Sequence, residues 1–288
     1  MYPSRFDYSA PTSLEEVLAK LAEVGEEGRV LAGGQSLIPM MKLRLAAPSF
    51  LVDINKLTDL AYVRRENGHL AVGALARHAE IAELENLADF SPVMADVAPS
   101  IADPLVRNRG TLCGSVAHCD PEGDWNSVML AVGATVVAVS TEGERTIPID
   151  EFIVDFFTNS LQTGEMVKEV RVPIPPGRKG GAYLKLHRKV GDYATVGVAT
   201  HLEFDDAGKI SKAGIGLTSV GPHNSRAAEA EAALVGQEPN DELFDHAGEL
   251  AAASCEPASD VRGPTKYKRA VVKEYTKRGL LKAANGGN

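Results

Sequence analysis

The sequence predicts an α+β protein built in two parts, and three observations support that prediction. The chain has 288 residues, close to the roughly 250–300 residues at which a single hydrophobic core stops growing. Its first part mixes helical and strand patterns, with strands too short and irregular for a plain doubly wound sheet. Its last part shows strand patterns in succession and then helical patterns in succession, which is typical of an α+β domain.

The clearest element of the first part is a helix over residues 12–24. Thr12 or Ser13 can cap it, and Glu15 and Glu16 stand in the first turn, where the helix dipole favours negative charge. Glycine pairs and other turn residues separate the elements that follow. We expect strands at 29–31, 50–54, 69–75, 134–140 and 145–149, one helix at 77–88 and another that begins near residue 91.

A boundary is predicted in the stretch 173-PIPPGRKGG-181, where proline, glycine and positive charge accumulate. It divides a first domain, residues 1–176, from a second, residues 177–288. In the second domain we expect strands at 182–190, 194–204 and 210–218, followed by helices at 225–235, 241–254 and 264–281.

Composition excludes several classes of function. The net charge of −9 argues against nucleic acid as a partner, because neutralising phosphates needs a basic surface. No apolar run reaches the ~18 residues of a membrane span, and the N-terminus has no apolar signal-peptide core. The three cysteines form neither a CxxC motif nor a Cys/His metal pattern. We therefore expect a cytoplasmic protein with reduced thiols and no metal site.

The stretch 32-AGGQS-36 is a candidate anion-binding loop. The strand ahead of it ends in Gly33 and Gly34, which leave backbone N–H groups uncovered by any Cβ. Gln35 and Ser36 add polar side chains that could bind a phosphate or a ring edge. The alternative is a tight turn between two core elements. The loop lacks the GK[ST] ending of a Walker loop and is not a GxGxxG fingerprint.

A second stretch, 107-RNRGTLCGSVAHCDPEGDW-125, favours the binding interpretation. It predicts another turn rich in backbone donors, formed by small residues between Gly110 and Ser115. Two such loops could hold one extended dinucleotide, and Asp120 or Asp124 could bind its ribose or adenine. For these two aspartates the alternative is a solvated turn.

The loops 32-AGGQS-36 and 111-TLCGS-115 resemble the two FAD-pyrophosphate loops of the flavin-binding medium subunit of molybdenum hydroxylases, the xanthine dehydrogenase and aerobic carbon monoxide dehydrogenase family. The flanking SLIPMMKLRLAAPSFLVDIN, VRNRGT, AHCDPEGD and YLKLHRKVGDYATVGVA are similar too, so the resemblance covers nearly the whole chain. It is closest to the carbon monoxide dehydrogenase branch. It implies a two-part FAD-binding domain of the vanillyl-alcohol oxidase/PCMH type over 1–176, with subdomains of about 1–57 and 58–176, and a smaller α+β domain over 177–288.

The resemblance also implies roles for particular residues. The two loops would bind the FAD pyrophosphate and ribitol, and Asp124 the adenosine ribose. Lys185 would lie near the flavin, where its charge stabilises a reduced ring, and Tyr193 would cover one ring face unless it is only a surface tyrosine. The expected cofactor-binding residues are Ala32, Gly33, Gly34, Gln35, Ser36, Ile101, Thr111, Cys113, Gly114, Ser115, Asp124, Val167, Lys185, Asp192 and Tyr193, with Ile101 and Val167 packed near the adenine.

Two positions depart from the family pattern. Gln35 stands where the first loop often has histidine, and Cys113 stands where the second often has glycine. A cysteine is tolerated there only if φ is negative and its Cβ points away from the phosphates. Cys113 could instead be a small apolar wall beside the cofactor.

By this resemblance the chain is an electron relay, and the chemistry belongs to its cofactor. A large partner subunit would hold the molybdenum cofactor and a small one the [2Fe–2S] clusters, in a dimer of heterotrimers. FAD would pass electrons to a quinone or another acceptor, with the complex at the inner face of the membrane. The alternatives are the FAD subunit of a xanthine, aldehyde or N-heterocycle dehydrogenase, a stand-alone flavin oxidase, and a nucleotide-binding protein without redox function. The scattered histidines, among them His78, are expected to be structural.

Overall fold

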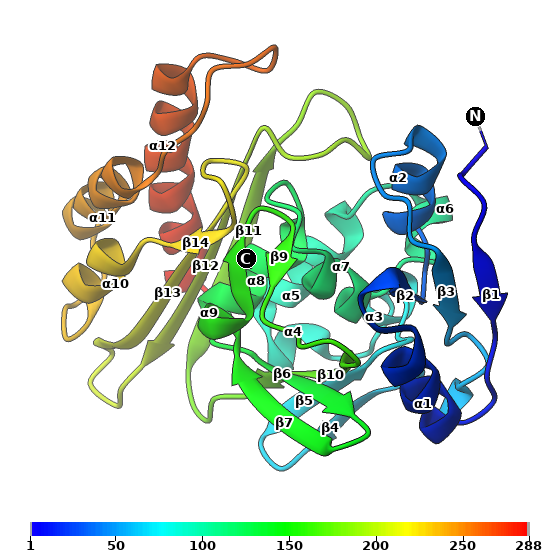
Figure 1. Cartoon of the computed structure of the whole chain (residues 1–288). Helices are drawn as coiled ribbons and strands as arrows, with labels where there is room; N and C mark the ends of the chain where they lie inside the picture. The colour runs from blue at the N-terminus through cyan, green and yellow to red at the C-terminus, as the bar shows by residue number, and fades with distance from the viewer. Residues whose placement is uncertain (1, 287–288) are drawn as a thin grey trace.

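The computed structural model describes residues 2–286, and over this range the strands form three sheets and a small hairpin (Figure 1). Helices cover the sheets, so the α+β expectation is confirmed. Three clusters of buried apolar side chains accompany the three sheets. Within the described range, no helix has both the length and the hydropathy that crossing a bilayer requires.

The N-terminal sheet is small and parallel, in the order β1-β3-β2. Helix α1 packs on it and begins as expected, because Ser13 Oγ accepts from the backbone N–H of Glu16 at 3.2 Å. The elements of this region are β1 (Asp7–Ser9), α1 (Leu14–Val24), η1 (Gly25–Glu27), β2 (Gly28–Leu31), α2 (Leu37–Leu43), β3 (Phe50–Asp53) and η2 (Thr58–Leu60).

The second sheet has five antiparallel strands in the order β4-β5-β10-β6-β7. Its central strand, β10, was not expected, because charged residues on its outer face interrupt the apolar pattern. The strands are β4 (Val63–Glu66), β5 (His69–Gly73), β6 (Thr135–Ser140), β7 (Gly143–Pro148) and β10 (Met166–Pro173), and the nearby hairpin joins β8 (Ile153–Asp155) to β9 (Thr158–Asn159).

The helices of the first part are shorter than predicted. The helix expected over 77–88 is split in two, since Asn86 adopts a left-handed conformation with φ 59°. The helices that follow the N-terminal sheet in this part of the chain are α3 (His78–Ala82), α4 (Leu87–Phe90), α5 (Pro92–Val97), η3 (Ala98–Ser100), α6 (Pro104–Arg107), α7 (Leu112–His118), α8 (Asp124–Val132) and α9 (Ile149–Phe152).

The C-terminal sheet confirms the expected run of strands and then helices. Helices α5 and α8 pack on one face of it and α10 and α12 on the other (Figure 1). Its elements are β11 (Lys179–Leu186), β12 (Val196–Phe204), β13 (Ile210–Thr218), β14 (Ser225–Arg226), α10 (Ala228–Leu234), α11 (Asp241–Ser254) and α12 (Thr265–Ala284).

Helix α8 ties the first part of the chain to this C-terminal sheet. All of its residues are buried. Gly214 and Gly216 alternate along β13 and lie against the α8 carbonyls of Ala131 and Ser127, where no Cβ would fit. The chain passes from the five-stranded to the four-stranded sheet between β10 and β11. The exact division at residue 176 stays a prediction.

Candidate functional site

The two glycine stretches pack backbone against backbone, although 70 and more residues separate them in sequence. A Cβ added to Gly33 would lie 2.7 Å from the Cα of Gly110 and closer still to the carbonyl oxygen of Arg109. Side chains are therefore excluded from this contact. The contact is made by main-chain groups, with Gly33 and Gly34 half-buried and Gly110 buried, and backbone that no side chain covers is what a closely approached anion requires.

A small polar network fixes the two stretches to each other. Asn55 Nδ2 donates to the carbonyl oxygen of Ala32 at 2.8 Å. Arg77 donates to Asn55 Oδ1 at 2.7 Å and to the carbonyl oxygen of Arg109 at 2.5 Å. Asn55 and Arg77 were missed by the sequence reasoning. The available signal was their position, since Asn55 directly follows the strand 50-FLVDI-54 and Arg77 opens the predicted helix.

The second stretch is the start of a helix, which corrects the expectation of a turn over these residues. Thr111 is the N-cap of α7, and its Oγ1 accepts from the backbone N–H of Gly114 at 3.0 Å. The N–H groups of Leu112 and Cys113 precede the first intrahelical donor and have no acceptor within the helix. Such groups, with the positive end of the helix dipole, favour a bound anion.

Cys113 contributes only its backbone to this helix start. Its side chain is buried, and Sγ donates to the carbonyl oxygen of Val72 at 3.3 Å. Burial raises the pKa of the thiol far above its usual range. Because its φ is not positive and its Cβ points into the core, cysteine replaces glycine here without obstructing the loop. It is therefore not a wall on the exposed side.

Asp124 forms a buried ion pair with Lys185. Lys185 Nζ lies 2.7 Å from Asp124 Oδ2, and the two side chains are 4% and 8% exposed. The Tyr183 hydroxyl donates to Asp124 Oδ1 at 2.6 Å. Burial raises the pKa of Asp124, against the opposing pull of the Lys185 charge. The alternative that Asp124 lies in a solvated turn is thus wrong. Asp124 is the first residue of α8, and its ion pair connects this helix to strand β11.

Tyr193 stands in the loop that joins β11 to β12 and is 48% exposed. Burial of its inner side, together with the charges of Asp120 and Glu122, raises the pKa of its hydroxyl. Asp192, beside it, lies 3.4 Å from Arg188. The loop thus faces the turn that leads from α7 into α8.

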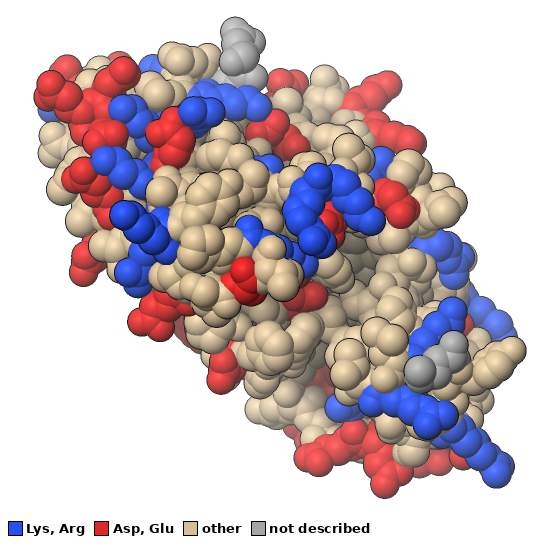
Figure 2. All heavy atoms as spheres, turned by 90° about the horizontal axis from the view of Figure 1, so that it is seen from above, with Lys and Arg blue, Asp and Glu red and all other residues tan. Residues whose placement is uncertain are grey.

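The surface around these loops is concave. A Cβ on Gly191 would lie 3.3 Å from the carbonyl oxygen of Ala102, so the β11–β12 loop reaches across to the segment before α6. Figure 2, which views the molecule from above, shows a hollow between the half that carries α10–α12 and the half that carries α2. The glycine stretches and the Tyr193 loop belong to this face (Figure 1).

Some of the expected site residues do not present their side chains here. Ile101 and Val167 are buried in the main core cluster, and Val167 pairs with Ala138 inside the five-stranded sheet. Gln35 is exposed and donates to the carbonyl oxygen of Gly33 at 3.3 Å. A contact of Ile101 or Val167 with adenine stays a prediction.

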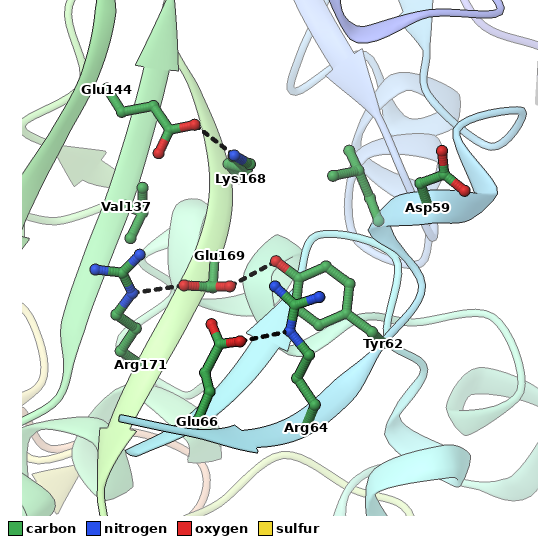
Figure 3. A pocket seen from close by; sticks show the side chains of 10 residues that line it. Asp59, Tyr62, Arg64, Glu66, Val137, Glu144, Lys168, Glu169 and Arg171 are labelled. Atoms are coloured by element: carbon green, nitrogen blue, oxygen red, sulfur yellow. Dashed lines mark hydrogen bonds and ion pairs between the residues drawn. The ribbon is translucent and has the colours of Figure 1, made fainter. Parts of the chain in front are cut away.

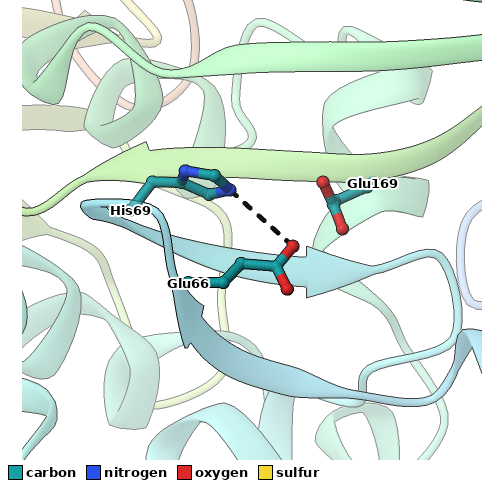
Figure 4. Close-up of side chains that lie close together, drawn as sticks. All are labelled: Glu66, His69 and Glu169. Atoms are coloured by element: carbon teal, nitrogen blue, oxygen red, sulfur yellow. Dashed lines mark ion pairs between the residues drawn. The ribbon is translucent and has the colours of Figure 1, made fainter.

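A separate polar cluster occupies the outer face of the five-stranded sheet, over a cavity of about 270 Å³ (Figure 3). Glu66, His69 and Glu169 lie close enough together to suggest a metal site (Figure 4). However, Arg171 lies 2.6 Å from Glu169 and Arg64 lies 3.0 Å from Glu66. Because two guanidinium groups already neutralise the two carboxylates, this cluster is an ion-pair network.

Two families of known proteins match successive parts of the chain. The family described as the FAD binding domain in molybdopterin dehydrogenase matches residues 4–175, and the family described as the CO dehydrogenase flavoprotein C-terminal domain matches residues 181–283.

Similar proteins are also found over the full length. The carbon monoxide dehydrogenase medium chain of Hydrogenophaga pseudoflava is 39% identical, with 97% of each chain covered. The 6-hydroxypseudooxynicotine dehydrogenase complex subunit alpha of Paenarthrobacter nicotinovorans is 38% identical, over 98% of this chain and 96% of the relative.

A solved structure superposes on nearly every residue. It is the carbon monoxide dehydrogenase from Hydrogenophaga pseudoflava that lacks the Mo-pyranopterin moiety of the molybdenum cofactor. A chain of that structure matches with a TM-score of 0.95 at 40% identity, with 99% of both chains covered. The chain described here therefore belongs to the molybdopterin dehydrogenase FAD-binding family.

Proposed function

We propose that this chain is the FAD-binding electron-transfer subunit of a molybdenum-containing dehydrogenase. The observation that supports this most is the backbone-to-backbone contact of Gly33 with Gly110 directly before the N-cap of α7, where the N–H groups of Leu112 and Cys113 have no acceptor within the helix. The residues fit the cofactor, since a pyrophosphate needs such donors and a flavin ring needs a flat cover such as Tyr193. Bound FAD would supply the exchange of electrons between one-electron and two-electron partners.

In this proposal the pyrophosphate and ribitol are held by residues 32–36 and 111–115. Asp124 binds the adenosine ribose, although two of its oxygen contacts are already taken by Lys185 and Tyr183. A carboxylate accepts about four hydrogen bonds, so capacity for a ribose hydroxyl remains. Lys185 is proposed to lie near the flavin ring as an ammonium held by its ion pair with Asp124, which offsets its charge, and Tyr193 limits the access of water to the ring.

The proposed partners are a large molybdopterin-binding subunit and a small [2Fe–2S] subunit, assembled as a dimer of heterotrimers. Val154 and Phe156 are exposed on the β8–β9 hairpin, and Phe157 beside them has φ 49°, which is uncommon for a bulky residue. The Phe157 N–H donates to the carbonyl oxygen of Cys119, next to the turn that faces Tyr193. This apolar patch supports a partner that docks beside the cofactor.

We propose carbon monoxide as the substrate of the complex and a quinone at the inner face of the membrane as its acceptor. The carbon monoxide dehydrogenase relatives support the substrate. Oxidation of a larger organic molecule is the second candidate, because a relative named for 6-hydroxypseudooxynicotine is almost equally identical. The substrate would be oxidised on the large subunit, so residues of this chain do not select it.

The test begins with the purified full-length chain. Its visible spectrum should show bound flavin, and acid denaturation should release all of it as FAD by mass spectrometry. The isolated chain should not oxidise carbon monoxide or 6-hydroxypseudooxynicotine with a dye, whereas the complex with both partners should oxidise one of them. Release of FMN, flavin that stays on the denatured chain, or turnover by the isolated chain would contradict the proposal.

A further inference from the structure

His78 and Trp125 lie directly beneath the second glycine stretch. A Cβ added to Gly110 would lie 2.7 Å from His78 Cδ2 and 2.8 Å from His78 Nε2, so one edge of the imidazole occupies the space below this glycine. The backbone N–H of His78 donates to the carbonyl oxygen of Gly110 at 3.0 Å. Gly33, Gly110, His78 and Trp125 thus follow one another from the surface into the core.

The imidazole is neutral and held in one tautomer. The indole Nε1–H of Trp125 donates to His78 Nδ1 at 3.0 Å, so Nδ1 is the acceptor and the proton resides on Nε2. Burial lowers the pKa of His78 to about 4, helped by the charges of Arg107 and Arg77. The ring therefore turns a fixed Nε2–H edge toward Gly110.

Gly33, Gly110, His78 and Trp125 form what we call the stack. Its innermost member, Trp125, lies at the start of α8. Trp125 is fully buried and follows Asp124, which pairs with Lys185 of β11. Through these contacts the ring connects the glycine stretches to the residue proposed to bind the ribose. Gly110 has no positive φ, so its need for glycine comes from its neighbours, the His78 ring at 2.7 Å and the Val106 carbonyl oxygen at 3.1 Å, and not from its own backbone conformation.

We propose that His78 is a positioning residue for the dinucleotide: held by the Trp125 indole, its ring supports Gly110 and sets the spacing of the second stretch against the first. This inference rests on the proposed FAD binding. A residue that only fills the core would not affect position 110 in particular. The proposed role instead predicts that the space available to a side chain at residue 110 depends on the side chain at residue 78.

That dependence is tested by a double-mutant cycle on the full-length chain, with FAD as the ligand. Gly110→Ala should weaken FAD binding about tenfold or more in the wild-type background, because the new methyl group meets the ring. In a His78→Ala background the same change should cost less than about threefold, since the ring is gone and only the looser contact with the Val106 carbonyl oxygen, at 3.1 Å, remains. His246→Ala, at an exposed position on α11, is the control background and should leave the tenfold loss unchanged.

A matched pair of variants tests the link to Trp125. Asn and Leu are similar in size, but only Asn can accept a hydrogen bond at the place of Nδ1. Trp125 is the only tryptophan, so its indole N–H gives a single resonance in a ¹H–¹⁵N spectrum. His78→Asn should keep that resonance near its wild-type position and retain most of the FAD affinity. His78→Leu should shift the resonance and bind FAD about tenfold more weakly.

An equal cost of Gly110→Ala in both backgrounds would overturn the inference, and so would equal FAD affinities of the Asn and Leu variants. If His78→Ala does not fold, the Asn and Leu pair decides. If the wild-type chain binds no FAD, the proposed function fails instead, and the cycle is then measured on the thermal midpoint of the flavin-free chain. A smaller loss of stability for Gly110→Ala in the His78→Ala background would still support the stack.

Discussion

Removing the ammonium group of Lys185 should destabilise the chain strongly even without a cofactor. Lys185→Met keeps the length of the side chain but leaves the Asp124 carboxylate in the core with only the Tyr183 hydroxyl, 2.6 Å away, to bind it. Breaking a buried pair by removing one partner costs about 3–5 kcal/mol, because the remaining charge is uncompensated. With about 2.1 cal/mol/K per residue over one cooperative unit, this lowers the thermal midpoint by roughly 5–8 °C.

The loss of stability caused by Lys185→Met should increase with pH. In the variant, burial acts on the carboxyl of Asp124 without the opposing ammonium, so its folded-state pKa rises further above the unfolded value of about 3.9. When the pKa of a group is higher in the folded than in the unfolded state, the group stabilises the fold at any pH below its unfolded-state pKa. That stabilisation is lost as the pH rises through its folded-state pKa. The gap between wild type and Lys185→Met should therefore be small in acid and grow toward neutral pH.

Urea unfolding of the flavin-free chains at several pH values measures this directly. Lys212→Met is the control, because Lys212 pairs with Glu203 at 3.2 Å on the surface and should cost no more than about 1 kcal/mol. Combining Lys185→Met with Asp124→Asn removes both charges and should recover much of the loss. A cost no larger than that of Lys212→Met at neutral pH, or one independent of pH, would refute the reasoning.

Three further predictions concern the cofactor and the partner. Gly33→Val and Gly114→Val should abolish FAD retention after gel filtration, because a Cβ would meet Gly110 in the first case and the capping Thr111 Oγ1, at 2.7 Å, in the second; full flavin content in both would show that these stretches are only turns. Tyr193→Ala should keep FAD but change its visible spectrum and reoxidation rate, with a two-electron potential shift of roughly 10–30 mV from the loss of ~0.5–1.5 kcal/mol of stacking; an unchanged spectrum and rate would place Tyr193 away from the ring. Phe156→Ser should leave FAD content intact but weaken co-purification with the small subunit, since it removes an exposed apolar contact; undiminished co-purification would place the interface elsewhere.

Local patterns were sufficient wherever a segment's own residues decide its conformation. Helix α1 begins at its serine cap, and strands β12 and β13 are rich in apolar and small residues. Strand β10 was missed because the charged residues Lys168, Glu169 and Arg171 interrupt its apolar pattern, although both of its edges are paired in the sheet. Pairing between distant segments leaves little signal in the sequence of one strand.

Some residues of the candidate site could likewise be predicted from the sequence and others could not. Gly33 and Gly34 could be recognised from their own sequence, since bare backbone donors need small residues. Asn55 and Arg77, which fix the two stretches, and His78 and Trp125, which lie beneath one of them, carry no motif. Their roles depend on which segments meet, and these segments are far apart in the chain.

The sequence by itself determined the α+β class, the order of the C-terminal elements and the two glycine stretches, and its resemblance pointed to the family that the comparisons establish. Only the tertiary structure decided that the second stretch is a helix start, that Cys113 turns into the core and that Asp124 is neutralised by Lys185. The physical reason is the range of the forces involved. Capping and hydrophobic periodicity act within a few residues, whereas the burial of a charge or the exclusion of a Cβ depends on atoms brought together from across the fold.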